Sequence, residues 1–154
     1  MNIDKIMNKQ VHTCRPDDSL NTAAQLMWER DIGCVPVLDF GGKAIGMITD
    51  RDICMSAYIT GLPLAAQTVS QAMSKSVHCI RASQSIDAAE ALMRSKQVRR
   101  LPVTDEAGKV VGIVSLNDLA LAAGKEPTRA LKPDQLTATL ASICQPRANS
   151  AARA

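Results

Sequence analysis

The chain contains one phrase twice, Gly46-Met47-Ile48-Thr49-Asp50-Arg51-Asp52 and Gly112-Ile113-Val114-Ser115-Leu116-Asn117-Asp118. Each copy reads glycine, two apolar residues, a hydroxyl residue, two variable residues and aspartate. The two copies are offset by 66 residues, the difference between 112 and 46. A strand that runs into a helix start is the simplest structure for this phrase, because a hydroxyl residue followed three positions later by an acid is typical of a helix N-terminus.

The same offset relates much of the remaining sequence without a gap. It places Ile3–Met7 on Val69–Met73 and Pro36-Val37 on Pro102-Val103. Further matches along this alignment are Val11-His12 with Val77-His78, Asp39 with Asp105, and Gly42-Lys43 with Gly108-Lys109. A constant offset through so many positions indicates an internal duplication.

Each unit has the same order of expected elements. A short turn leads to an extended stretch (11–15 or 77–81), and Ser19 or Ser85 then caps an amphipathic helix, which ends near Gly33 in the first unit. Two strands joined by a turn follow (35–38 and 44–48, or 101–104 and 110–114), and a closing helix starts near Thr49 or Ser115. The sequence therefore predicts an α/β (α+β) fold of two tandem β-α-β-β-α repeats, related by a pseudo-twofold axis and sharing one core.

The expected boundaries place the first repeat at residues 1–62, the second at 63–124, and a C-terminal tail at 125–154. Within the tail, a short helix is expected from Lys132-Pro133-Asp134-Gln135 through Ile143. Its apolar face would consist of Leu136, Leu140 and Ile143. We expect residues 147–154 to be disordered.

Composition narrows the classes of function. The 154 residues are 46% hydrophobic and 21% charged, with a net charge of +3, so a basic stripe for nucleic acid is not expected. No apolar run reaches membrane-spanning length and no signal peptide is evident, which favours a cytoplasmic protein with no membrane partner. The five cysteines form no C-x-x-C pair, so free thiols are expected. Aromatic residues make up only 2%, which predicts an aliphatic core.

The repeated phrase allows two interpretations of its polar residues. The hydroxyl of Thr49 and the carboxylate of Asp52 can form a reciprocal capping box that satisfies backbone donors at the helix start. The same residues can hold a ligand, because a helix N-terminus offers donors to a phosphate and a carboxylate can accept both hydroxyls of a ribose. The residues alone leave both roles open.

Together, the element order and the phrases Val35-Pro36-Val37, Leu101-Pro102-Val103 and the two seven-residue copies resemble a CBS domain pair, also called a Bateman module. The resemblance covers residues 1 to 123. It implies binding of an adenosine derivative (AMP, ADP, ATP or S-adenosylmethionine) in clefts between the repeats. It also implies that Asp52 and Asp118 bind ribose, with Thr49 and Ser115 near the ribose or phosphate.

By this resemblance each phrase faces the other repeat, which gives two clefts. Cleft one would contain Met47, Thr49, Asp52, Val77, His78, Cys79, Arg99 and Arg100. Cleft two would contain Val11, His12, Thr13, Gly33, Cys34, Ile113, Ser115 and Asp118. Because guanidinium groups suit phosphates, we expect a phosphorylated adenosine in cleft one. Cleft two would be empty or hold a less anionic ligand.

The leading prediction is a regulatory sensor that binds an adenosine nucleotide and transmits its state to an unidentified partner protein. The alternative is a ligand-free dimerising scaffold. No nucleophile is paired with a base, so no catalytic residue is predicted. A metal site at the equivalent His12 and His78, with Cys14 or Cys79, is disfavoured, and none is predicted. The resemblance implies a homodimer, with Ile53, Met55, Leu119 and Leu121 as candidate contacts.

Overall fold

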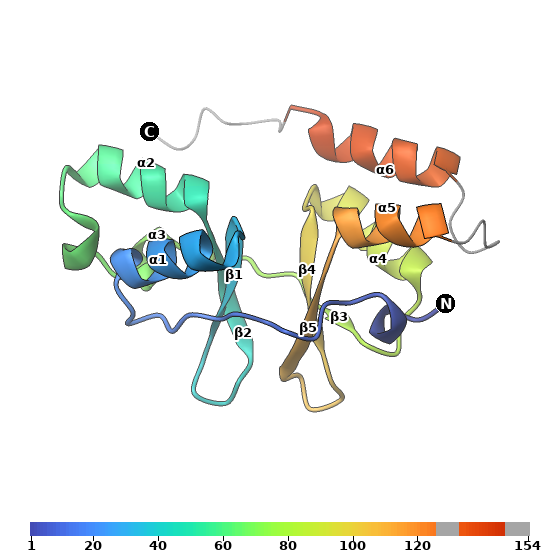
Figure 1. Cartoon of the computed structure of the whole chain (residues 1–154), viewed down its shortest axis with the longest axis horizontal. Helices are drawn as coiled ribbons and strands as arrows, with labels where there is room; N and C mark the ends of the chain where they lie inside the picture. Colours follow the sequence, from blue (N-terminus) through green and yellow to red (C-terminus); the bar gives the residue numbers. More distant parts are fainter. Residues whose placement is uncertain (126–132, 147–154) are drawn as a thin grey trace.

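The structure, a computed structural model, describes residues 1–125 and 133–146. Figure 1 shows two halves side by side, with their hairpins at the centre and their helices towards the outside. The first half contains α1 (Leu20–Arg30), β1 (Cys34–Leu38), β2 (Ala44–Thr49), α2 (Asp50–Thr60), η2 (Leu64–Ala66) and α3 (Val69–Ala72). The second contains η1 (Ile3–Lys5), β3 (Ile80–Arg81), α4 (Ile86–Lys96), β4 (Arg100–Thr104), β5 (Val110–Ser115), α5 (Leu116–Lys125) and α6 (Pro133–Cys144).

Each half is built on an antiparallel hairpin, β1–β2 or β4–β5. The registers match, because Cys34 lies opposite Thr49 and Arg100 lies opposite Ser115. Strand β3 adds to β4 in parallel and makes a three-stranded sheet in the second half. The predicted α/β (α+β) architecture of two repeats is therefore confirmed.

The first expected strand is nearly absent from the first half. Over residues 11–15 only Cys14 pairs with the sheet, as an isolated parallel bridge to Val37. Its amide donates to the Pro36 carbonyl over 3.0 Å, and its carbonyl accepts from the Leu38 amide over 2.9 Å. The predicted strand at residues 11–15 is therefore present only as one bridging residue, Cys14.

The predicted helix starts are confirmed. The hydroxyl of Ser19 accepts from the Thr22 amide over 3.1 Å, and that of Ser85 accepts from the Ala88 amide over 3.2 Å. The first helix ends earlier than expected, at Arg30 and not near Gly33. The cause is Asp31, whose left-handed backbone (φ 52°) stops the helix. The equivalent residue of the second repeat, Gln97, has the same conformation (φ 50°).

The halves have two separate aliphatic cores, so the prediction of one shared core is wrong. Each sheet packs against the helices of its own half. The first core consists of Cys14, Leu20, Ala23, Met27, Val35, Val37, Ile48, Ile53 and Val69. The second consists of Ile3, Ile80, Ile86, Ala89, Met93, Leu101, Val103, Val114 and Leu119.

The two repeats exchange their N-terminal segments. Ile3, the start of the first repeat in sequence, is fully buried in the second core, and Val69 from the second repeat is fully buried in the first. Figure 1 shows η1 beside the second half, from which the chain crosses to α1. Each core is therefore completed by a segment that belongs, by sequence, to the other repeat.

Helix α6 lies on α4 and α5. Leu136 and Ile143 pack against the second core as expected, but Leu140 is 47% exposed. Thr139 is buried in its place, and its hydroxyl donates to the Gln135 carbonyl over 2.9 Å. The hydrogen bond removes the cost of burying the hydroxyl, so a polar residue takes the position predicted for a leucine. Residues 147–154, for which we expect disorder, lie outside the described residues.

The aromatic residues take no part in either core. Trp28, Phe40 and Tyr58 are 88%, 91% and 81% exposed. The Arg15 guanidinium lies 3.9 Å from the centre of the Phe40 ring. Within residues 1–125 and 133–146, no helix is long and apolar enough to span a bilayer.

Candidate functional site

A cavity of about 560 Å³ lies between the repeats, and we call it the inter-repeat cavity. The second repeat contributes the Ser115–Asp118 phrase from the end of β5 and the start of α5, together with Arg100 at the start of β4. The first repeat contributes the segment before α1 and the loop between α1 and β1. The residues that line it are Asn8, Gln10, Val11, His12, Glu29, Arg30, Asp31, Ile32, Gly33, Cys34, Pro36, Arg100, Ile113, Ser115, Asn117 and Asp118.

The cavity brings together most of the residues that the sequence placed in cleft two. Val11, His12, Gly33 and Cys34 meet Ile113, Ser115 and Asp118 across it. Thr13 is the exception, because it is exposed and does not line the cavity. The segment that carries Val11 and His12 is held beside β5 at Asn8. The amide and the carbonyl of Asn8 each form a 2.9 Å hydrogen bond with the backbone of Ile113.

Ser115 and Asp118 are held rigidly by each other. The Asp118 carboxylate accepts from the Ser115 amide over 2.7 Å and from the Ser115 hydroxyl over 2.6 Å. The Asp118 amide donates back to the hydroxyl over 3.3 Å. The capping interpretation is therefore correct here, and the cap also fixes the carboxylate of a residue that lines the cavity.

Two arginines line the inter-repeat cavity, Arg30 from the last turn of α1 and Arg100 from β4. The sequence placed no arginine in cleft two, so these two guanidinium groups are an addition to the predicted set. Arg100, which the sequence placed in cleft one, lies directly opposite Ser115 in the β4–β5 register. The side chain that begins β4 thus lines the cavity of its own repeat's phrase, a position that the resemblance did not imply.

Sequence analysis missed several of the lining residues. They are Asn8, Gln10, Glu29, Arg30, Asp31, Ile32, Pro36 and Asn117. Asn117 falls within the repeated phrase itself, so its place in the phrase could have identified it. Arg30 and its neighbours lie at the end of α1. They line the cavity because the C-terminal end of this helix lies close to the second repeat, which the sequence does not indicate.

One backbone contact of cleft one, at β2, corresponds to the contact between Asn8 and Ile113 at β5. The backbones of Met47 and Ser74 are joined by two hydrogen bonds of 3.1 and 2.8 Å, so the segment that leads to Val77, His78 and Cys79 runs beside β2. Thr49 and Asp52 form a second capping box, with 3.0 Å from the Thr49 amide to the carboxylate. Arg99 is exposed. None of these residues lines the inter-repeat cavity.

The thiol in the cavity is protonated at neutral pH. Burial raises the pKa of Cys34 to about 11, while Arg100 acts in the opposite direction. Burial also raises the pKa of Cys14 to about 11 and that of Cys79 above its usual value. Among residues 1–125 and 133–146, no group of three or more His, Cys, Asp and Glu side chains is placed to hold a metal ion.

Comparison with known proteins agrees with the two-repeat architecture. The family model for the CBS domain matches residues 3–57 and again residues 69–125. The CBS domain-containing protein YhcV of Bacillus subtilis is 39% identical over 116 residues, 75% of this chain and 80% of that protein. Hypoxic response protein 1 of Mycobacterium tuberculosis is 34% identical over 143 residues, 93% of this chain and 94% of that protein.

Solved structures give the same result. Hypoxic Response Protein I with two coordinated zinc ions has a TM-score of 0.71 at 34% identity, covering 79% of this chain and 98% of that one. The CBS domain pair of MJ0100 with 5-methylthioadenosine and S-adenosyl-L-methionine has a TM-score of 0.71 at 27% identity, covering 82% and 98%. CBSX2 in complex with AMP has a TM-score of 0.69 at 25% identity, covering 80% and 96%.

Proposed function

The chain belongs to the CBS domain family, and from this membership we propose that it is a regulatory module that binds an adenosine nucleotide in the inter-repeat cavity. Binding would alter how the two repeats sit against each other and so signal to a partner protein. A ligand shifts such an equilibrium only by its difference in affinity for the two states. The cavity meets this requirement, because both repeats line it and a change in their relative position changes the site.

The observation that carries the proposal is that Asp118 and Arg100 both line the inter-repeat cavity. Ser115 holds the Asp118 carboxylate in place for ribose hydroxyls to contact, and Arg100 lies opposite Ser115 on the neighbouring strand. Directly opposed residues on paired strands have β-carbons about 5 Å apart. A ribose at Asp118 and its 5′-phosphate at Arg100 therefore suit one nucleotide. The AMP-bound and S-adenosylmethionine-bound relatives support this class of ligand.

We place the adenine against the apolar and backbone surfaces of the first repeat. Val11, Ile32 and Cys34 line the cavity there. Among the residues that line it there is no Phe, Tyr or Trp, and the imidazole of His12 is the one aromatic ring available to the base. Arg30 adds a second guanidinium that can contact a phosphate, in a cavity that the carboxylates of Glu29, Asp31 and Asp118 also line.

Titration calorimetry with AMP, ADP, ATP and S-adenosylmethionine tests the proposal. Arg100→Ala should weaken the binding of AMP at least tenfold, since a charge-assisted phosphate contact contributes about 1.5–3 kcal/mol. Arg99→Ala is the matched control, because it removes the same charge from the adjacent, exposed position outside the cavity. Its AMP affinity should change less than threefold. Equal losses in the two variants would show that Arg100 acts only through net charge.

The second candidate function is a ligand-free dimerising scaffold. The large exposed apolar residues of α1 and α2, among them Trp28, Met55, Tyr58 and Ile59, favour it. We expect a homodimer in either case, and no catalytic activity. No binding of any of the four adenosine compounds, together with a dimer in sedimentation, would support the scaffold and refute the sensor.

A further inference from the structure

The second half buries a carboxyl group that has no partner. Glu90, in α4, is 1% exposed, and its Oε1 atom accepts no hydrogen bond within residues 1–125 and 133–146. Neither of the two ion pairs in this part of the chain, Lys5–Asp4 and Arg81–Glu106, involves it. A charged carboxylate is strongly disfavoured away from water unless it is paired, so this environment suits the protonated form.

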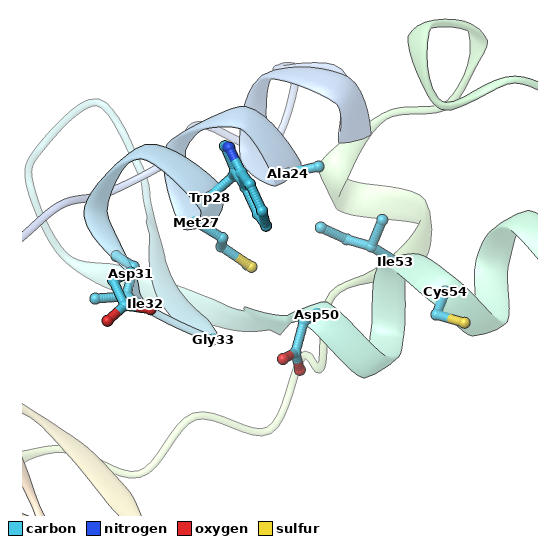
Figure 2. Close-up of a pocket in the computed structure, with 9 residues that line it drawn as sticks. All are labelled: Ala24, Met27, Trp28, Asp31, Ile32, Gly33, Asp50, Ile53 and Cys54. Atoms are coloured by element: carbon cyan, nitrogen blue, oxygen red, sulfur yellow. The ribbon is translucent and has the colours of Figure 1, made fainter.

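Comparison of the two halves shows what buries Glu90. The offset of 66 residues relates Glu90 to Ala24. Ala24 is only half-buried, and it lines a hollow of about 440 Å³ between α1 and α2 (Figure 2). In the second half the corresponding helix pair, α4 and α5, is covered by α6 (Figure 1). We infer that α6 is the element that closes the second half over Glu90.

The helical structure of α6 depends on its docking. The helix has 12 residues, and a helix of this length is marginal in water by itself. Its docked face includes the buried Thr139. At its C-terminal end, Gln97 donates from Nε2 to the carbonyl of Ser142 over 3.2 Å and to that of Gln145 over 3.5 Å. Once α6 leaves α4 and α5, its backbone amides therefore exchange with solvent.

Burial is the main influence on the protonation of Glu90. It raises the pKa of this carboxyl group, while Arg94 opposes the effect and Asp87 adds to it, both from α4 itself. The elements around α4 carry other ionisable side chains among the described residues, which are Asp134 and Cys144 of α6, Asp118 of α5, Arg100 of β4, and Asp4 and Lys5 of η1. None of these contributes to the shift in the pKa of Glu90. The charge of Glu90 is therefore linked to whether α6 is docked.

We propose that α6 is a pH-sensitive cover, which stays docked on α4 and α5 while Glu90 is protonated and is released as Glu90 ionises. Docking is fully favoured below the ordinary carboxyl pKa of 4.5, and it weakens as the pH rises through the raised pKa of the docked state. Because one proton is involved, the docking constant falls by at most about tenfold per pH unit in this interval. Glu90 does not line the inter-repeat cavity, so the inference does not depend on nucleotide binding.

Hydrogen–deuterium exchange of the full chain, read by mass spectrometry, measures the docking of α6. The exchange rate of residues 133–146 is divided by that of the unfolded chain at the same pH, which removes the intrinsic effect of pH on exchange. Between about pH 5 and about pH 8, the resulting protection of α6 should fall by up to about tenfold per pH unit. The protection of β4 should change less, because α6 is released while the sheet stays folded.

Two variants identify the group responsible. Glu90→Gln removes the ionising group, so the protection of α6 should become nearly independent of pH. Gln97→Asn is the matched control, because it shortens the side chain that bonds the end of α6, and asparagine tolerates the left-handed backbone of residue 97. It should lower the protection of α6 by about fivefold at every pH and leave the pH dependence in place.

Three results would overturn the proposal. The first is protection of α6 in the unsubstituted chain that does not change with pH, a result that needs no variant to fold. The second is an unchanged pH dependence in Glu90→Gln. The third is an equal loss of protection in α6 and β4, which would mean that the whole second half unfolds and that α6 is not released by itself.

Discussion

Cys34 and Arg100 occupy equivalent positions, at the first residues of β1 and β4, and both line the same inter-repeat cavity. The duplication therefore brings two matched backbone positions to one cavity but places different chemistry on them, a buried thiol from one repeat and a guanidinium from the other. This difference makes the cavity asymmetric, and it allows several predictions to use one repeat as the control for the other.

The two capping boxes give the first such prediction. Ser115→Ala and Thr49→Ala each remove a cap, and each should lower the free energy of unfolding by about 1 kcal/mol. Only Ser115 lines the inter-repeat cavity, so only Ser115→Ala should weaken the binding of AMP. Urea unfolding and calorimetry measure the two effects. If Thr49→Ala weakened binding equally, a ligand in cleft one would be indicated.

The cysteines should fall into two classes that react quickly or slowly with an alkylating reagent. Cys54 and Cys144 are exposed, whereas burial raises the pKa of Cys14 and Cys34 to about 11. Because the thiolate is the reacting species, the two buried thiols should be almost unreactive at about pH 8 in the folded protein. Timed labelling with iodoacetamide, followed by mass spectrometry, would show this order. Rapid labelling of Cys34 would mean that the cavity opens to solvent.

Glu90 should make the protein less stable as the pH rises. Its side chain is 1% exposed, Oε1 has no hydrogen-bond partner, and burial raises its pKa, with Asp87 adding to the effect and Arg94 opposing it. A carboxyl group whose pKa is raised on folding stabilises the fold below its ordinary pKa of 4.5, and this contribution is lost as the pH rises through the raised value.

Replacing the carboxyl group tests this directly. Glu90→Gln should raise the free energy of unfolding by about 1 kcal/mol at neutral pH and have little effect in acid. Thermal unfolding of both proteins between about pH 4 and about pH 8 measures the difference. Since α6 covers the helix pair that carries Glu90, a constant difference at all pH values would indicate a packing effect instead.

Substitutions at Gly46 and Gly112 test how closely the exchanged segments approach β2 and β5. A β-carbon on Gly46 would lie 2.8 Å from the Ser74 carbonyl oxygen and 2.7 Å from the Met73 sulfur. On Gly112 the carbonyl oxygen of Asn8 is more distant, at 3.3 Å, and the nearest atom belongs to the flexible Met7 side chain. Gly46→Ala should therefore destabilise by about 1–3 kcal/mol, and Gly112→Ala by less. Chemical unfolding distinguishes the two, and the reverse order would contradict this account.

The parts of the structure that depend on local sequence were predictable. The repeated phrase correctly predicted two capped helices, and the strand pairs that precede them predicted two hairpins, because each of these features is formed by residues close together in the chain. The residues of cleft two were also placed together, apart from Thr13. Their grouping follows from the facing of each phrase towards the other repeat, which the resemblance supplied.

The remaining features depend on contacts between distant segments. Arg30 lies in an ordinary helix end, and nothing in its neighbours indicates that it lines a cavity. Thr139, not Leu140, is buried in α6 because docking on α4 and α5 sets the rotation of the helix. The apolar pattern of a short helix leaves that rotation uncertain by about one residue. The residues on the buried face of α6 could therefore be identified only from the structure.

The exchange of Ile3 and Val69 between the two cores also determines whether the chain can be split into two fragments that fold separately. A cut between residues 62 and 63 would separate the sequence repeats, yet each fragment would carry the piece that closes the other's interior. Two such fragments are built to reassociate with each other, and neither is a self-sufficient protein. A single repeat of this design would need a second molecule to complete its interior, and the tandem arrangement supplies both within one chain.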